Sequence, residues 1–238
     1  GHFGRGQHFV AEADEYVTEP NYDRSPQFMY QHPTIAIITN IDHDHPDIYP
    51  RIEDVQQAFL RFANQIVNGV VIICGDAKTA KDFLKQYKGN VLTYGFSPLN
   101  DYVISSYRVE NGKIHFRVQG KEIDLGAFML SVPGEHNALN SVAACLAARE
   151  TGITLEACKQ ALVSFQGTKR RLEYKGTLQN GAILYDDYAH HPTEIISSLH
   201  ALKRMYPTKS LLCIFQPHTY SRTKELFHEF TDSFTDAD

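Results

Sequence analysis

Two runs of consecutive apolar and β-branched residues limit the folds open to this chain. Residues Thr34 to Asn40 and Val70 to Cys74 lack the alternation of polar and apolar side chains found in a strand with one wet face. Uninterrupted runs of this kind are typical of strands buried on both faces of a parallel sheet. Between them, apolar residues recur at helical spacing from Ile52 to Ile66. The order of strand, helix and strand predicts an α/β fold with a mostly parallel sheet.

The pattern changes near Tyr102. Alternating runs on both sides of Asn111-Gly112 predict an antiparallel hairpin with a type I′ turn. The segment Gly167 to Arg170 is typical of a linker, and we expect a second α/β unit after it. We therefore divide the chain into a first domain, residues 1–168, and a second domain, residues 169–238.

Further elements follow from the same patterns. A short strand is expected from His8 to Ala13, ahead of a polar loop. The second domain should contain a hairpin (172–178 and 182–186), a helix (193–206), a strand (210–215) and a last helix from about Thr223. In the first domain, helices are expected at 77–87, 135–150 and 154–164, and a strand at 91–94.

Composition excludes several classes of protein. The net charge of −5 with mixed signs, and no run of Lys or Arg, argue against a nucleic-acid partner. No apolar run approaches the ~18 residues of a membrane span, so no membrane insertion is expected. The four cysteines lie far apart within apolar or helical patterns, as in a reduced cytoplasmic protein. They are Cys74, Cys145, Cys158 and Cys213.

The stretch from Tyr185 to Glu194 is the richest in chemistry. It carries three carboxylates, two tyrosines and two imidazoles where an apolar strand gives way to a helix. Open α/β sheets place ligands at such junctions, because side chains and free backbone N–H groups converge there. The stretch predicts a ligand or catalytic site. The alternative is a helix N-cap beside a solvated histidine pair, with Pro192 and Glu194 in the first turn, and both interpretations can hold together.

A metal site is a second candidate. Glu12 and His45 each follow a predicted buried strand, and a carboxylate with an imidazole at neighbouring strand ends can hold a divalent cation. The cluster from Asp42 to Asp47 could instead form a tighter transition-metal site, since imidazoles suit zinc, iron and nickel. A third interpretation is a loop whose acids cap the following helix.

Three weaker signals remain. Asn137 and Asn140 share one face of a helix start and could present amides to a base or ribose, or Asn137 could simply cap the helix. Arg170 and Arg171 at the linker could clamp a phosphate, although paired arginines are more often solvated. Residues 216–223 follow a predicted strand and begin a helix, which favours a substrate site over plain capping.

Six segments, in this order, resemble the Mur ligase family, and within it the alanine-adding branch. The resemblance extends over essentially the whole chain. The segments are Val-Ala-Glu-Ala-Asp-Glu (10–15), Thr-Asn-Ile-Asp-His-Asp-His-Pro-Asp (39–47), Gly-Glu-His-Asn-Ala-Leu-Asn (134–140), Arg-Arg-Leu-Glu (170–173), Asp-Asp-Tyr-Ala-His-His-Pro-Thr-Glu (186–194) and Gln-Pro-His-Thr-Tyr-Ser-Arg-Thr (216–223). The last two separate this branch from the ligases that add other residues.

The resemblance implies a fold and a reaction. Residues 1–168 would form the family's central ATP-binding domain, a mostly parallel sheet with a small antiparallel β subdomain. Residues 169–238 would form a partial, Rossmann-like C-terminal domain. The implied reaction joins L-alanine to UDP-N-acetylmuramate in cytoplasmic peptidoglycan precursor synthesis. ATP and Mg²⁺ activate the sugar carboxylate as an acyl phosphate, which needs positioning and charge neutralisation but no protein nucleophile.

The resemblance also implies roles for individual residues, carried over position by position. Catalytic roles fall to Glu12, His45, Asp187 and His190. Magnesium would be held by Glu12 and His45. ATP would be bound by His136, Asn137, Asn140, Arg171, Asp187 and Tyr188. The muramate and alanine pocket would be lined by His190, His191, His218, Ser221 and Arg222.

The chain departs from the family pattern in one important respect. The glycine-rich loop with Gly-Lys-Thr that cradles the triphosphate does not occur in it, nor do the UDP-binding domain and the second half of the C-terminal domain. We therefore expect an excerpt of a longer protein, without ligase activity by itself. There is no lysine between Arg51 and Ala77, where other Mur ligases carry a carbamylated lysine that the alanine-adding branch generally lacks.

Three alternatives stay open. Within the family, the murein-peptide-recycling ligase shares the His-His-Pro motif. From another class, a phosphohydrolase built on the His43-Asp44-His45 cluster would bind zinc, iron or manganese and act without ATP. A non-catalytic remnant would serve only as a binding module.

Overall fold

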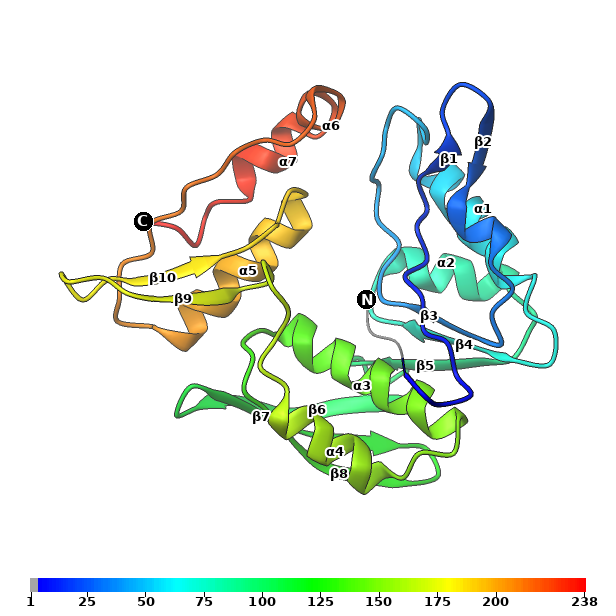
Figure 1. Ribbon diagram of the computed structural model, residues 1–238, viewed down its shortest axis with the longest axis horizontal. Helices are drawn as coiled ribbons and strands as arrows, with labels where there is room; N and C mark the ends of the chain where they lie inside the picture. Colours follow the sequence, from blue (N-terminus) through cyan, green and yellow to red (C-terminus); the bar gives the residue numbers. More distant parts are fainter. Residues whose placement is uncertain (1–3) are drawn as a thin grey trace.

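A six-stranded sheet forms the centre of the first domain (Figure 1). The computed structural model describes residues 4–238, so residues 1–3 of the expected first domain lie outside the described residues. In spatial order the strands are β3 (Ile35–Ile38), β4 (Val70–Cys74), β5 (Val91–Gly95), β6 (Tyr102–Glu110), β7 (Lys113–Gly120) and β8 (Asp124–Leu130). Neighbours from β3 to β6 pair parallel, and β6, β7 and β8 pair antiparallel. The expected α/β class, with an antiparallel addition, is confirmed.

Strand β4 explains why its sequence shows no alternation. Ile72 and Cys74 face one hydrophobic cluster, whereas Val71 and Ile73 face another on the opposite side of the sheet. Helices α3 (Glu135–Glu150) and α4 (Leu155–Ser164) contribute to the first cluster. Helices α1 (Ile52–Ala63) and α2 (Lys78–Gln86) contribute to the second. Because helices cover both faces, every position of β4 is buried.

The hairpin between β6 and β7 has the predicted turn. Asn111 and Gly112 adopt φ values of 51° and 71°, and two consecutive positive φ values are the mark of a type I′ turn. Strand β8 has no counterpart in the expected elements. Its burial alternates irregularly, and Gly126 adopts a φ of 75° within it, so the period-two signal is broken. The small antiparallel subdomain thus has one strand more than its sequence pattern indicates.

Two expected strands, 8–13 and 210–215, are wrong. Within residues 4–238 both segments lie outside every strand and have no ladder partner. Val10 and Ile214 are 92% and 93% exposed, so apolar side chains here contact water. A strand needs a neighbouring strand to satisfy its N–H and C=O groups. A local sequence pattern indicates β-propensity, but it does not show whether another segment is there to pair with it.

The polar loop before His32 holds short elements of its own. A two-stranded hairpin is formed by β1 (Val17–Glu19) and β2 (Asp23–Pro26), and the 3₁₀-helix η1 (Gln27–Tyr30) follows. Phe28 of η1 is 1% exposed and stacks on Phe62 of α1 at 4.6 Å between ring centroids. The contact anchors the N-terminal segment against α1.

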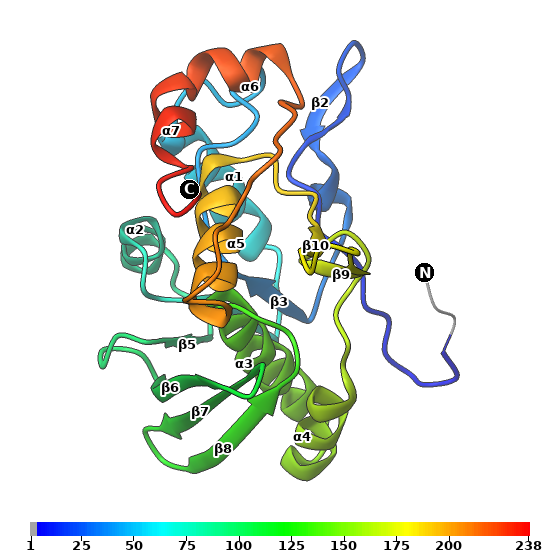
Figure 2. The same ribbon diagram turned by 90° about the vertical axis from the view of Figure 1, so that its left-hand side faces the viewer.

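The second domain is smaller and has its own core. Strands β9 (Glu173–Thr177) and β10 (Ile183–Asp186) form the expected hairpin, and α5 (Pro192–Met205) follows it. Helices α6 (Tyr220–Glu225) and α7 (Phe227–Asp232) replace the single helix expected from about Thr223. The core consists of Ile195, Leu199, Leu226 and Phe230. Figure 2 shows the C-terminal end of α5 above α3. Among the helices of residues 4–238, none is both long and apolar enough to cross a membrane.

The two-sided burial of β4 leads to a stability prediction. Ile73→Ala should lower the free energy of unfolding by about 2–5 kcal/mol, because Ile73 is fully buried and its removal leaves a cavity. Ile37→Ala in β3 is the matched control. Because Ile37 is 43% exposed, this variant should lose much less free energy of unfolding. Urea denaturation of both variants measures the difference. Equal losses would contradict the assignment of β4 as the central buried strand.

Candidate active site

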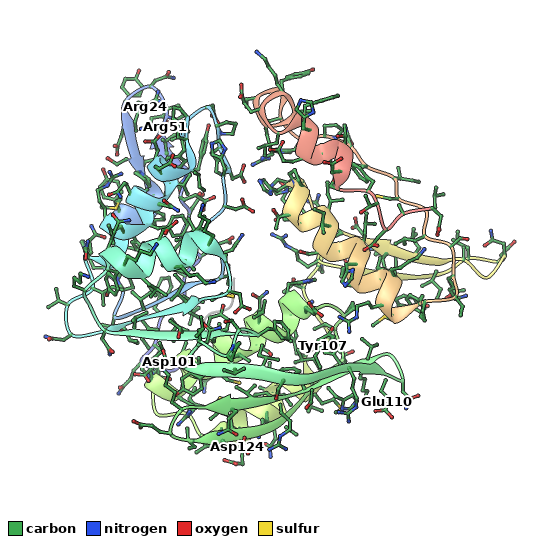
Figure 3. All side chains as sticks on the ribbon, turned by 180° about the vertical axis from the view of Figure 1, so that it is seen from behind. Arg24, Arg51, Asp101, Tyr107, Glu110 and Asp124 are labelled. Carbon is green, nitrogen blue, oxygen red and sulfur yellow. The ribbon has the colours of Figure 1, made fainter. Side chains whose placement is uncertain are left out.

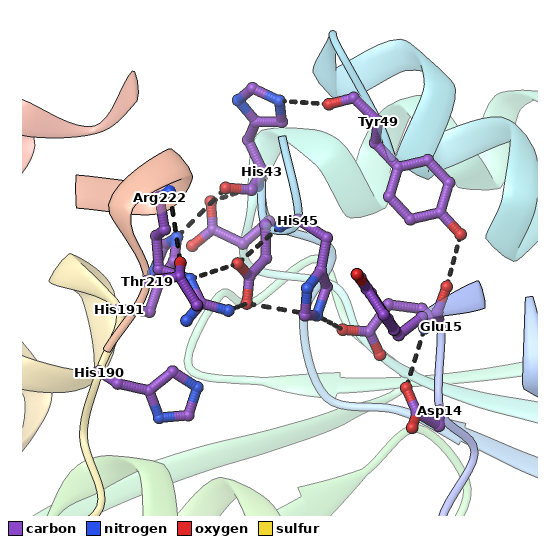
Figure 4. A network of polar contacts seen from close by, with 12 residues as sticks. Asp14, Glu15, His43, His45, Tyr49, His190, His191, Thr219 and Arg222 are labelled. Atoms are coloured by element: carbon purple, nitrogen blue, oxygen red, sulfur yellow. Dashed lines mark hydrogen bonds and ion pairs between the residues drawn. The ribbon is translucent and has the colours of Figure 1, made fainter. Parts of the chain in front are cut away.

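The loop after β3 collects the polar contacts of the site (Figure 4). His45 Nε2 lies 3.1 Å from Glu15 Oε1 and 3.7 Å from Asp44 Oδ2. These three side chains can offer ligand atoms that all lie within 4.8 Å of one another. His45 has a φ of 54°, which is rare outside glycine and asparagine. Such strain persists only where surrounding contacts impose it, as is common at functional sites.

The carboxylate beside His45 belongs to Glu15 and not to Glu12, which the sequence pairs with His45. Glu12 is exposed, and among residues 4–238 only its backbone carbonyl has a hydrogen-bond partner, the side-chain amide of Gln31 at 3.0 Å. Asp14 Oδ1 accepts from the N–H of Tyr16 at 2.8 Å, which turns the chain and directs Glu15 toward His45. An aspartate that bonds the backbone two residues later is a known turn signal, and it could have pointed to Glu15.

Tyr49 ties the two segments of this cluster together. Its hydroxyl donates to the backbone carbonyl of Glu15 at 2.6 Å, and its own carbonyl accepts from His43 Nε2 at 2.9 Å. Burial raises the pKa of Tyr49 to about 12, so the hydroxyl stays a donor at neutral pH. Tyr49 therefore holds Glu15 and the loop after β3 at a fixed separation.

The second domain reaches the same loop from the other side. Arg222 Nε and Nη2 donate to the two carboxylate oxygens of Asp44 at 2.7 and 3.0 Å, a bidentate pair. Thr193 Oγ1 donates to Asp42 Oδ2 at 2.6 Å. His191 Nε2 donates to the carbonyl of His43 at 3.2 Å. Three consecutive residues of one loop thus contact the second domain.

His191 also begins helix α5. Its Nδ1 accepts from the N–H of Thr193 at 3.3 Å, as an N-cap does. Glu194 Oε2 accepts from the backbone N–H groups of His190 and His191 at 2.8 and 3.2 Å. Burial raises the pKa of Glu194, but these N–H groups, His190 and Arg171 more than compensate, and the net shift is downward. The N-cap predicted within Tyr185 to Glu194 is confirmed, but the histidine pair is not solvated, because His191 is 8% exposed and contacts the loop after β3.

The charged side chains of the loop after β3 are stabilised by neighbouring groups of opposite charge. Burial alone would raise the pKa of Asp44, but the Arg222 guanidinium and His45 hold it below its usual value. Burial alone would lower the pKa of His45, but Glu15 and Asp44 raise it. Arg222 is 4% exposed, and its Nη1 has no hydrogen-bond partner among residues 4–238. One donor of a buried cation is therefore available to a further acceptor.

A cavity of about 1190 Å³ opens beside the loop and is shared by both domains. The first domain and the second domain each supply polar side chains to its wall. Those that matter here are Glu15, Asp42, Asp44, His136, Asn137, Asn140, Arg171, Asp187 and His191. Five of the six residues predicted to bind ATP thus share one cavity with the carboxylates of the loop.

Some predicted ligand residues are already engaged locally. The two oxygens of Asp187 accept from the N–H groups of Leu172 and Ala189, each at 2.7 Å, so Asp187 holds the linker against the strand end. Asn137 Nδ2 donates to the carbonyl of Pro133, but the N-cap of α3 is Gly134, so Asn137 does not cap the helix. Arg171 Nη1 donates to Glu194 Oε1 at 3.2 Å.

Tyr188, His190 and His218 form an aromatic group away from this cavity wall. The ring of His190 lies 4.8 Å from that of Tyr188 and 5.5 Å from that of His218. The Arg170 guanidinium stacks over Tyr188 at 4.2 Å. Ser221 is exposed and separate from these rings. The residues predicted for the substrate therefore divide between this aromatic group, the loop contacts of His191 and Arg222, and the surface.

Comparisons with known proteins identify the family of both domains. The Mur ligase middle domain matches residues 5–148, and the Mur ligase, glutamate ligase domain matches residues 170–238. The chain belongs to the Mur ligase family.

Its sequence is similar to two UDP-N-acetylmuramate–L-alanine ligases. The ligase of Carboxydothermus hydrogenoformans is 39% identical over 99% of this chain and 49% of its own length. The ligase of Geobacter sp. strain M21 is 40% identical over the same shares. The chain spans about half the length of these curated relatives. In fold, it resembles the solved UDP-N-acetylmuramate–alanine ligase of Thermotoga maritima, with a TM-score of 0.69 and 24% identity over 87% of this chain and 45% of that one.

The bidentate pair between Asp44 and Arg222 leads to a stability prediction. Arg222→Gln should cost about 3–5 kcal/mol of unfolding free energy, because it leaves the half-buried Asp44 without its counter-charge. Arg51→Gln is the control, since Arg51 pairs with Asp54 at the surface with 72% of its side chain exposed. Chemical denaturation should show almost no change for that control. A loss for Arg222→Gln no larger than that of the control would contradict a buried pair.

The raised pKa of His45 predicts a pH dependence. Because the pKa of His45 is higher in the folded state, protonated His45 stabilises the fold. This stabilisation is complete below about pH 6.5 and is lost as the pH rises through the pKa that His45 has in the folded state. Glu15→Gln removes the main group that raises it. In chelator-treated buffer, the stability lost in Glu15→Gln should thus be largest below about pH 6.5 and shrink by about pH 8. Glu19→Gln in exposed β1 is the control, and a loss that grows with pH would refute the pairing.

Proposed function

We propose that the full-length protein joins L-alanine to UDP-N-acetylmuramate, using ATP and an acyl-phosphate intermediate. The observation that supports this most directly is the shared cavity, where carboxylates after β3 meet amides and a guanidinium from elements far apart in sequence. The similarity to alanine-adding ligases supports the same substrates. Acyl-phosphate chemistry depends on positioning and charge neutralisation, which this set of side chains can provide.

Magnesium fits the cluster after β3. Carboxylate oxygens are ligands that Mg²⁺ prefers, and among residues 4–238 Glu15 and His45 pair with each other but with no Lys or Arg, whereas Asp44 is occupied by Arg222. We propose Glu15 and His45 as ligands and keep Glu12, on the same segment, as a further predicted ligand. When bound, the ion would neutralise charge on the nucleotide phosphates and the activated carboxylate.

The remaining residues would hold the two organic substrates. We propose that Asn137, Asn140 and His136 contact the nucleotide from α3, and that Arg171, Asp187 and Tyr188 contact it from the second domain. Arg222 would use its unpaired Nη1 for an anionic group of the substrate. His190, His191, His218 and Ser221 complete the proposed substrate set. Because the proposed nucleotide set draws residues from both domains, binding ATP requires the domains to stay together.

Two organisational features belong to the same proposal. A domain boundary near residue 168 is supported by the gap between the matched regions, 5–148 and 170–238. A cytoplasmic location is supported by four free cysteines and by the supply of ATP there. The murein-peptide-recycling ligase is the alternative within the family.

Phosphate release by the full-length gene product tests the proposal. With UDP-N-acetylmuramate, Mg²⁺ and ATP, release should depend on added L-alanine. His45→Ala and Asp187→Ala should each lower the rate by roughly 10–100-fold or more, since one removes a proposed metal ligand and the other releases the linker. Asp124→Asn, on the exposed face of β8, should not change it.

Each of the other outcomes would favour one of the alternative functions. Release that ignores both alanine and the nucleotide sugar would favour a metal-dependent phosphohydrolase. Release that needs a peptide in place of alanine would favour the recycling ligase. No ATP turnover in a folded full-length protein would favour a non-catalytic remnant.

A further inference from the structure

A second polar contact joins the two domains at the far end of α5. Arg204, in the last turn of α5, donates through Nη1 to the carboxylate of Glu135, the first residue of α3. The same guanidinium lies over the ring of Tyr107 in β6, 4.8 Å from its centroid. Figure 3 labels Tyr107 on the side of the sheet that faces the second domain. One cation of the second domain thus contacts two elements of the first.

This contact is separate from the loop after β3. It borders a crevice of about 140 Å³, whose wall includes Tyr107, Glu135, His200 and Arg204. None of the carboxylates near His45 reaches it. The two ends of α5 are therefore held by independent groups.

The packing between these groups is close. Gly134 precedes α3 with a φ of 102°, and a Cβ placed there would lie 3.2 Å from Cβ of Ala201 in α5 and 2.4 Å from Cε1 of His136. Only glycine suits that φ and that space. The start of α3 is thus pressed against α5 one turn away from Arg204. Any shift of this end of α5 would therefore displace Glu135, His136 and Asn137.

We propose that Arg204 is a positioning residue: it fixes the C-terminal end of α5 on the first turn of α3. Through Glu135 it sets where His136 and Asn137 lie relative to Asp187 and Arg171 across the cavity. The consequence for nucleotide binding rests on the proposed function. The contact of Arg204 with Glu135 and Tyr107, which we call the clamp, does not. The side chains of Arg204 and Glu135 are 38% and 42% exposed, so the ion pair is a weak tether that the stack on Tyr107 reinforces.

Hydrogen exchange of the 238-residue chain tests the clamp. Arg204→Glu and Glu135→Arg should each raise amide exchange in peptides covering 134–141 and 196–206 by about 3- to 10-fold, the combined size of an exposed ion pair and a cation–π contact. The double variant restores opposite charges and should return exchange to near the wild-type rate. Arg204→Lys keeps the charge but loses the planar stack, and should fall between them.

A matched control lies on the same strand as Tyr107. Arg108→Glu breaks the pair with Glu110 within β6, which joins no second element, and should leave both peptides unchanged. Unchanged exchange in both single charge reversals would overturn the clamp. Faster exchange that the double variant fails to reverse would also overturn it, because the effect would then come from general disturbance and not from the pair.

Kinetics of the full-length protein test the positioning role. Arg204→Glu should raise KM for ATP by about 3- to 10-fold with kcat within about twofold, and the double reversal should restore KM. A changed exchange rate with an unchanged KM would overturn the positioning role. A wild-type protein without ATP-dependent activity would instead refute the proposed function, and the exchange experiment would still decide on the clamp.

Discussion

The buried pair between Asp44 and Arg222 is the interaction on which the site depends. It joins residues 178 positions apart and is the strongest polar link between the domains. Asp44 is the residue before His45, so the pair also fixes the loop that brings His45 to Glu15. Without it, a half-buried carboxylate and a fully buried guanidinium would each lose their partner. The loop, the acidic cluster and the docking of the second domain are therefore parts of one arrangement.

Helix α5 contacts the first domain at both of its ends. Its N-terminal end carries His191 and Thr193 on the loop after β3, and its C-terminal end carries Arg204 on α3. The cavity lies between these two contacts and takes its walls from both domains. A rigid helix of 14 residues held at both ends defines the distance between the walls. The shape of the cavity is thus set by contacts that lie largely outside it.

Local signals in the sequence predicted local structure well. The unbroken apolar run of β4, the Asn111-Gly112 turn and the helix that begins at Pro192 all depend on neighbouring residues, and the structure has them. Position-by-position resemblance to the Mur ligases identified six of the polar residues that line the cavity: His136, Asn137, Asn140, Arg171, Asp187 and His191. What sequence could not supply were partners from distant segments: Glu15 in place of Glu12 beside His45, and Glu135 for Arg204. The expected strands at 8–13 and 210–215 failed for the same reason, because pairing is a property of two segments.

Those unpaired segments have a consequence for behaviour in solution. Backbone that has no ladder partner among residues 4–238, flanked by exposed Phe9, Val10, Leu212 and Ile214, is a template onto which another chain can add a strand. Apolar side chains on such an edge make the addition favourable. In this 238-residue form, two separate sites per molecule would allow edge-to-edge growth into open assemblies, since two edges can propagate where one could only form pairs.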